Sequence, residues 1–239
     1  ARGIVVTGKA RAEHRISTDA EGFLARMKEP GQEQAVVSGG LEGGICPGAV
    51  AMEGMERTLA THRSSTLLED VVVTNKVSQN LHAELWLHHL GKRTFCGGGS
   101  TVEGARLVRA FLEHVGVDKD DFVFFDGSGL SGHDLVTPRA TVRLLQYASG
   151  QPWFADWKRS LPVGGEDGSL ISRFGKAPLK DHVFAKTGTL GEARALSGYL
   201  ECASGTTVIF SVMVGNHMPQ TNDDRDVMDK IVAAIAAEN

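Results

Sequence analysis

Two short polar segments carry the residues best suited to chemistry. Lys186-Thr187-Gly188-Thr189 follows a β-like run, so alternation along the strand predicts Lys186 and Gly188 on one face and the two threonines on the other. An ammonium group flanked by hydroxyls, beside a bare glycine backbone that a ligand can approach closely, suits the binding of a carboxylate or phosphate. On its own, however, this tetrapeptide is more typical of a solvated lysine before a turn.

The second segment is Ser78-Gln79-Asn80, which lies between two predicted helices. There its side chains can face a cleft instead of competing for the hydrogen bonds of a helix backbone. Alternatively, Ser78 simply caps the helix that follows it. The two segments lie about a hundred residues apart with the loop 126–131 between them, and their order matches the S-x-N and K-T-G signatures of serine enzymes that recognise penicillin.

Helix start and stop signals predict the elements that position these segments. Thr66-x-x-Glu69 and Ser100-x-x-Glu103 are capping boxes, and Thr137-Pro138 is typical of an N-cap with proline at the first helical position. Gly91 and Gly116 fit the left-handed position that ends helices. The expected helices run from Thr66 through Val73, from Gln79 to Leu90, from Ser100 to Gly116, from Thr137 to Gly150 and from Asp223 to the C-terminus.

Strand-like runs cover 122–125, 182–187, 195–202 and 206–214, and Ala203-Ser204-Gly205 forms a plausible hairpin loop between the last two. Most of the expected helices precede an antiparallel hairpin near the end of the sequence, and this order predicts an α+β fold.

Composition excludes several classes of protein. The 239 residues carry a formal net charge of −4, with 41% hydrophobic and 23% charged residues, as in an ordinary globular chain, so nothing indicates a nucleic-acid partner. The longest uncharged apolar stretches, 208–214 and 231–237, are far shorter than the ~20 residues that span a bilayer, so no transmembrane segment is predicted. Cys46, Cys96 and Cys202 are too few for a disulfide framework, and their pairing stays open.

Four motifs, in this order and spacing, resemble the penicillin-binding protein 4 type of D-alanyl-D-alanine carboxypeptidases/endopeptidases. The matching segments are Asn75-Lys76-x-Ser78-x-Asn80-Leu81-x-Ala83-Glu84, Asp126-Gly127-Ser128-Gly129-Leu130-Ser131 with Thr137-Pro138, Leu161-Pro162-x-x-Gly165-x-Asp167-Gly168, and Ala185-Lys186-Thr187-Gly188-Thr189-Leu190 followed by Ser197-Gly198-Tyr199.

The resemblance implies a β-lactamase/transpeptidase-like fold, with a five-stranded antiparallel sheet flanked by helices. Residues 58–239 would form the C-terminal part of the catalytic domain, and residues 1–57 would be a remnant of an inserted domain and its return segment. It also implies a hydrolase located outside the cytoplasmic membrane, in the periplasm or its equivalent. This enzyme would act on peptidoglycan stem peptides, bind β-lactams, and need no metal or organic cofactor.

Roles of individual residues also follow from the resemblance. Ser78 would pass a proton to the leaving amine with electrostatic help from Lys186, and Asn80 would hold a substrate amide. Thr187 and Thr189 would bind the terminal carboxylate beside Gly188, with the Thr189 N–H in the oxyanion hole. Ser128 and Leu130 would line the same cleft.

The sequence departs from the family in three places. No serine is followed by lysine three residues later, so the S-x-x-K motif with the acylated nucleophile is absent from this sequence. We therefore expect that motif on an N-terminal segment or a separate N-terminal chain. Gly132 and Asp134 stand where relatives often carry Arg and Asn, which leaves the preferred substrate side chain open.

Other functions remain to be weighed. Gly127-x-Gly129-x-x-Gly132 spells a dinucleotide-binding pattern, but the helix it should open begins only near Thr137. His82-Ala83-Glu84 imitates the H-x-E of zinc deaminases without the P-C-x-x-C that completes their metal site, so no metal is predicted. The missing S-x-x-K leaves open a non-catalytic relative that binds peptidoglycan peptides or a partner.

Overall fold

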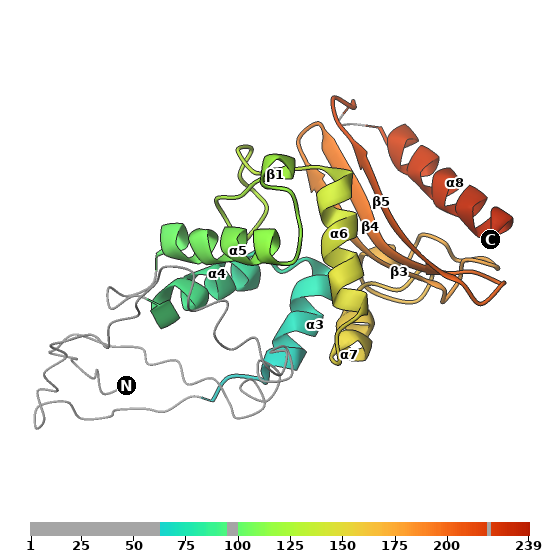
Figure 1. Cartoon of the computed structure of the whole chain (residues 1–239). Coiled ribbons are helices and arrows are strands. Elements are labelled where there is room, and N and C mark those ends of the chain that lie inside the picture. The colour runs from blue at the N-terminus through green and yellow to red at the C-terminus, as the bar shows by residue number, and fades with distance from the viewer. Residues whose placement is uncertain (1–62, 95–99, 219–220) are drawn as a thin grey trace, which may run out of the picture.

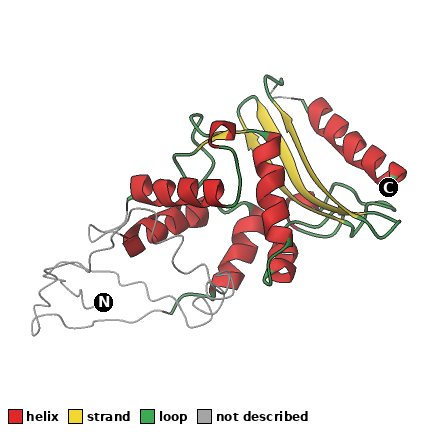
Figure 2. Ribbon diagram, viewed as in Figure 1, coloured by secondary structure: helices red, strands yellow, loops and turns green. Residues whose placement is uncertain are grey.

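The computed structural model describes residues 63–94, 100–218 and 221–239. The remnant domain expected over residues 1–57 and the states of Cys46 and Cys96 lie outside the described residues, whereas Cys202 is buried and unpaired. The longer helices are α3 (Leu67–Val77), α4 (Asn80–Thr94), α5 (Thr101–His114), α6 (Pro138–Ser149), α7 (Phe154–Ser160) and α8 (Asp223–Glu238), and they combine with antiparallel strands in an α+β fold (Figures 1 and 2).

A three-stranded antiparallel sheet is the centre of the fold. Its strands β3 (Val183–Leu190), β4 (Ala193–Glu201) and β5 (Thr207–Val214) lie in sequence order, as the three strand-like runs predicted. A separate two-stranded ribbon pairs β1 (Phe122–Val123) with β2 (Leu135–Val136). The described residues therefore hold three strands of the sheet, and the expected count of five stays a prediction.

Helices cover both faces of the sheet, α8 one face and α6 the other (Figure 1). On the α8 side, alternate side chains of the strands pack against one stripe of the helix, and burial of each large side chain stabilises the fold by about 1.5–3 kcal/mol. The core residues here include Val183, Ala185, Leu196, Leu200, Phe210, Met228 and Val232.

On the other face, Tyr199 fixes the sheet to α6. Its ring is fully buried with Leu145 and Leu161, and its hydroxyl donates a 2.9 Å hydrogen bond to the carbonyl oxygen of Leu145. Burial raises the pKa of Tyr199 to about 12. The face of the sheet opposite α8 is therefore held in a fixed position relative to α6.

The predicted caps form, but two helix ends differ from expectation. Thr66 and Glu69 make the reciprocal capping box of α3, which runs to Val77 instead of Val73. Gly91 was expected to end its helix, yet α4 continues to Thr94. A side chain at Gly91 would meet the carbonyl oxygen of Ser100 at 2.6 Å, so glycine there allows close backbone approach and does not serve as a stop.

The remaining helix signals are confirmed. Ser100 caps α5, Gly116 follows it with φ 87°, and Thr137 caps α6 with Pro138 in its first turn. The predicted strand 122–125 was too long, because only Phe122 and Val123 pair with β2.

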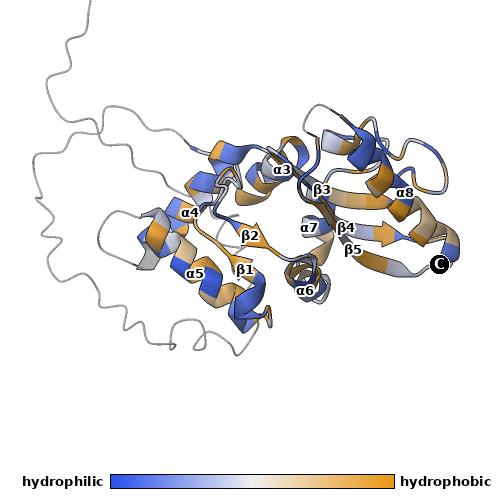
Figure 3. Ribbon diagram, turned by 90° about the horizontal axis from the view of Figure 1, so that it is seen from above, coloured by the Kyte–Doolittle hydropathy of each residue, from blue (hydrophilic) through white to orange (hydrophobic). Residues whose placement is uncertain are grey.

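The strands β1 and β2 consist of hydrophobic residues (Figure 3). The side chains of Val123, Leu135 and Val136 on these strands, and of Phe125 and Leu130 between them, are exposed. No helix among the described residues is long and apolar enough to cross a membrane. Within the same residues, no group of three or more His, Cys, Asp or Glu side chains is placed to hold a metal ion.

Candidate active site

Ser78 lies in the sharp turn between α3 and α4. It adopts the left-handed conformation, φ 55° and ψ 53°, and its N–H donates to the carbonyl oxygen of Thr74, so it ends α3 and does not cap α4. Asn80 is the first residue of α4. A non-glycine residue held at positive φ is uncommon and requires support from its surroundings.

Lys186 provides that support from the edge strand β3. Its ammonium group donates a hydrogen bond to the Ser78 hydroxyl oxygen and a second, of 2.8 Å, to the Thr187 carbonyl oxygen. The two segments selected from the sequence therefore meet in space, although they are 108 residues apart. The prediction that Ser78 faces a cleft and not only a helix end is consistent with this contact.

Lys186 is partly buried, and no described carboxylate lies within ion-pairing distance of its ammonium group. Burial therefore lowers the pKa of Lys186 below its ordinary value near 10.5. Such a lysine can still act as a cation near neutral pH, and it gives up a proton more readily than an exposed one.

The alternation predicted for the Lys186–Thr189 segment is confirmed. Val183 and Ala185 pack on the α8 side of the sheet and Phe184 on the opposite side, so Lys186 shares the face of Phe184 and the threonines share the face of Ala185. The Thr187 hydroxyl donates to Ser169 Oγ at 2.7 Å. Gly188 and Thr189 are exposed at the end of β3.

Lys76 fastens the end of α3 to the segment that leads into β3. Its ammonium group donates 2.6 Å hydrogen bonds to the Leu161 carbonyl oxygen and to the Asp167 carboxylate. Asp167 also accepts from the N–H of Val163 at 2.9 Å. A side chain at Gly168 would meet the Lys76 carbonyl oxygen at 2.6 Å, so the two segments approach at backbone contact. This pair fixes the position of Ser78 relative to β3.

The loop 126–131 is organised by one carboxylate and attached by another. Asp126 accepts from the Ser128 hydroxyl and from the N–H groups of Gly129 and Ser131, each at 2.7 Å. Burial acts to raise the pKa of Asp126, but these hydrogen bonds outweigh it and lower the pKa. Glu84, on α4, accepts from the N–H of Gly127 at 2.7 Å and so holds the loop beside the helix that begins at Asn80.

Within this loop the two predicted cleft residues differ. The Ser128 hydroxyl donates to Asp126 and accepts from the Leu130 N–H at 3.2 Å, so it acts inside the loop. The Leu130 side chain is exposed. Asp134 accepts from the N–H of Phe125 at 2.7 Å, and burial raises its pKa. The roles of Ser128 and Leu130 toward a ligand stay predictions.

Three structural roles were not foreseen, namely those of Lys76 with Asp167, of Glu84, and of Ser169. Lys76, Asp167 and Glu84 belong to the quoted motifs, but their partners lie on other elements, so no local sequence pattern identifies these contacts. Ser169 follows the third motif without belonging to it.

The two alternative motifs have structural explanations. Gly127-x-Gly129-x-x-Gly132 lies in a loop, and the next helix along the chain, α6, begins only at Pro138, so the glycines do not open that helix. His82 lies 2.6 Å from an Asp70 carboxylate oxygen, and His88 lies 3.5 Å from Glu84 in the expected i,i+4 pair.

Comparison with known proteins adds a family match. Residues 32–238 match the model of the D-Ala-D-Ala carboxypeptidase 3 (S13) family. The chain is 37% identical, over 77% of its length, to a D-alanyl-D-alanine carboxypeptidase of Actinomadura sp. (strain R39), and 29% identical, over 66%, to D-alanyl-D-alanine carboxypeptidase DacB of Haemophilus influenzae. It spans only 36% and 34% of those relatives, about a third of their length.

Solved structures give the same result. A β-lactam complex of penicillin binding protein 4 from Haemophilus influenzae superposes with a TM-score of 0.68 at 25% identity, over 77% of this chain and 44% of that one. The TLA-3 extended-spectrum β-lactamase superposes with a TM-score of 0.58 at 15% identity, over 73% and 64% of the two chains. The second match shows a shared fold alone.

Proposed function

Since the chain belongs to the D-Ala-D-Ala carboxypeptidase 3 (S13) family, we propose that it forms the larger part of the catalytic site of a serine D,D-peptidase. This enzyme would cleave the bond after a D-alanyl residue in peptidoglycan stem peptides. The observation that carries the proposal is the contact between Lys186 and the Ser78 hydroxyl, because it joins an acid/base candidate to a cation at the edge of the sheet.

The nucleophile would come from an S-x-x-K motif outside this sequence, on a preceding segment or a separate chain. Its serine oxygen would form a bond to the D-alanyl carbonyl carbon, and the bond from that carbon to the leaving nitrogen would break. Ser78 would relay the proton from the attacking hydroxyl to the leaving amine. Water would then hydrolyse the acyl-enzyme to the shortened peptide and restore the serine.

Lys186 would assist this relay as a cation. Its hydrogen bond to Ser78 Oγ leaves the serine proton free to point toward the leaving amine, and its charge stabilises the negative charge that develops on oxygen. Asn80 would hold a substrate amide, and Thr187 and Thr189 would bind the terminal carboxylate. The N–H of Thr189 would donate to the oxyanion, which in acyl transfer is commonly worth about 3 kcal/mol.

Two further parts of the proposal rest on the relatives. Binding of β-lactams is supported by the β-lactam complex of the Haemophilus influenzae protein. Action on peptidoglycan would place the enzyme in the periplasm or elsewhere outside the cytoplasmic membrane.

The experiment is to measure release of D-alanine from a peptide ending in D-alanyl-D-alanine, using the longer protein that includes the S-x-x-K motif. We expect release, and we expect none after the serine of that motif is replaced by alanine. No release by the unmodified protein, with the peptide bound, would favour the non-catalytic peptide-binding alternative.

The same assay tests Lys186 through its pH dependence. Because burial lowers the pKa of Lys186, its charge is lost as the pH rises through a value below 10.5, and activity should fall on that alkaline side. A Lys186→Arg variant keeps its charge to higher pH. We expect the activity of this variant to fall at a higher pH than that of the unmodified protein, even if its maximal rate is lower. An unchanged alkaline limb would mean that another group controls it.

A further inference from the structure

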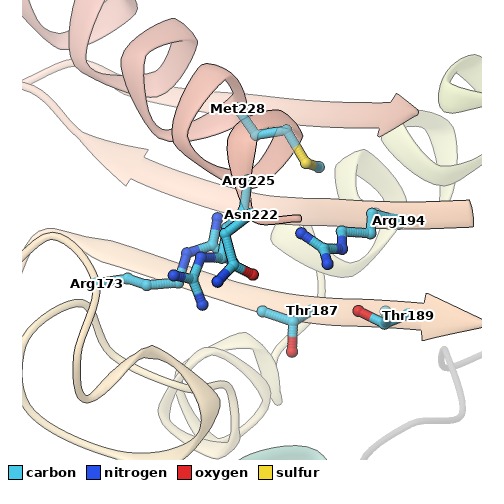
Figure 4. A pocket seen from close by; sticks show the side chains of 9 residues that line it. Arg173, Thr187, Thr189, Arg194, Asn222, Arg225 and Met228 are labelled. Carbon is cyan, nitrogen blue, oxygen red and sulfur yellow. The ribbon is translucent and has the colours of Figure 1, made fainter. Parts of the chain in front are cut away.

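The threonines that follow Lys186 also form one wall of a cavity whose other lining residues have no part in the proposed chemistry. The cavity, of about 140 Å³, lies on the α8 side of β3, beyond these threonines. This volume is well above the ~10–15 Å³ that one water molecule needs, so the cavity has room for a carboxylate on a short stem. Arg173, Asn222 and Arg225 gather at one end, Arg194 faces them from β4, and Thr187 and Thr189 lie along β3 (Figure 4).

The lining is cationic and rich in donors. Three arginines and no acidic side chain line the cavity. Arg173 is bound by Asp229 through its Nε and one terminal nitrogen. Arg194 donates to Asp224 at 2.7 Å and to the Thr221 carbonyl oxygen at 2.9 Å. A guanidinium has five N–H donors, so both retain donors that these contacts do not use.

Arg225 differs from the other two arginines, because no described carboxylate lies within ion-pairing distance of it. Asn222 stands at the N-cap of α8, but its side chain makes no capping hydrogen bond. Figure 4 draws both side chains at the end of the cavity where Arg173 lies. The cavity therefore combines the Arg225 guanidinium, which has no carboxylate partner among the described residues, with the Asn222 amide and two arginines that are already paired. Such a lining favours an anion, and the planar guanidinium group matches the geometry of a carboxylate.

We infer that this cavity binds a second carboxylate on the leaving residue of the substrate, with Arg225 as the residue that determines the preference. The inference rests on the proposed function. If the first carboxylate of the leaving residue binds at Thr187 and Thr189, the same hydroxyls form one wall of the cavity, and the side chain of that residue extends toward Arg225. The substrate class is therefore a D-alanyl peptide whose leaving residue carries an acidic side chain.

The test compares two peptides that differ only in charge, one ending in D-alanyl-D-glutamate and the other in D-alanyl-D-glutamine. In the longer protein that includes S-x-x-K, we expect kcat/KM to favour the glutamate peptide about tenfold, as expected for a charge-assisted hydrogen bond. Arg225→Gln should abolish this preference, because kcat/KM falls for the glutamate peptide far more than for the glutamine peptide. Arg225→Lys should restore part of it.

Lys230→Gln is the matched control, because it removes one positive charge from an exposed position on the same helix and outside the cavity. It should keep the preference. A protein with no preference for glutamate overturns the inference, as does a preference that survives Arg225→Gln or an equal loss on both peptides. Acylation by penicillin separates the two proposals: if it is normal while the preference is absent, only the cavity inference fails. If no protein is acylated, the proposed function fails and the inference falls with it.

Discussion

A Ser78→Ala variant is expected to be acylated by penicillin about 10²- to 10⁴-fold more slowly than the unmodified protein, the usual contribution of a positioned general acid or base. The hydroxyl oxygen of Ser78 is the acceptor of the Lys186 ammonium group at the point where the helical region meets the sheet. In the proposed mechanism, loss of this hydroxyl removes the relay that carries the proton of the attacking serine to the leaving amine. The measurement is the rate at which acylated protein accumulates, followed by intact mass, in the longer protein that includes S-x-x-K.

Two control variants separate the hydroxyl from its surroundings. Ser78→Gly removes the hydroxyl while relieving the left-handed backbone conformation, so it should be as slow as Ser78→Ala. Ser169→Ala removes a neighbouring hydroxyl that bonds Thr187, and it should slow acylation far less. Equal effects of the Ser169 and Ser78 variants would show that packing, and not proton transfer, explains the loss.

The second large effect concerns stability. Gly198 lies opposite Ala185 in β4, and an added Cβ would meet the Phe184 carbonyl oxygen at 2.1 Å and the Ala185 Cα at 2.6 Å. These are backbone atoms of β3, so the strand itself must move. We expect Gly198→Ala to reduce the free energy of unfolding by about 3 kcal/mol, at the upper end of overpacking effects. For a chain of this size, that lowers the melting temperature by about 6–12 °C.

Gly188→Ala is the control, because its added Cβ would meet only the Ala195 side chain at an ordinary 3.6 Å. It should leave the melting temperature nearly unchanged. Displacement of β3 also moves Lys186, the neighbour of Ala185, so Gly198→Ala should slow acylation even at temperatures where the protein is folded. An unchanged melting temperature would contradict the tight pairing of β3 with β4.

Features with a local cause could be predicted from the sequence. The capping box at Thr66, the Thr137-Pro138 start and the alternation around Lys186 depend on residues within a few positions, and the structure contains each of them. Of the capping box predicted at Ser100, the structure contains the N-cap hydrogen bond from the Glu103 N–H to the Ser100 hydroxyl oxygen. The role of Gly91 could not be predicted, because the atoms that require a glycine there belong to Ser100, beyond the end of the helix.

The same distinction between local and long-range causes applies to the candidate site. Ser78 and Lys186 could be paired through the resemblance to a family, because no local rule joins residues 108 positions apart. Lys76 with Asp167 and the cavity around Arg225 depend on how α3, β3 and α8 pack. Their residue types are ordinary, and only their position in the fold gives them significance.

In the proposed mechanism, Ser78 and Lys186 serve a nucleophile that belongs to an S-x-x-K motif, which this sequence does not contain. The direct test is to incubate the protein as isolated with a penicillin, denature it, and measure the intact mass of every polypeptide present. A penicillin adduct on a polypeptide or segment that carries S-x-x-K, with none on residues 1–239, is the predicted result. An adduct on a serine within residues 1–239, or no adduct when S-x-x-K is present, would contradict it.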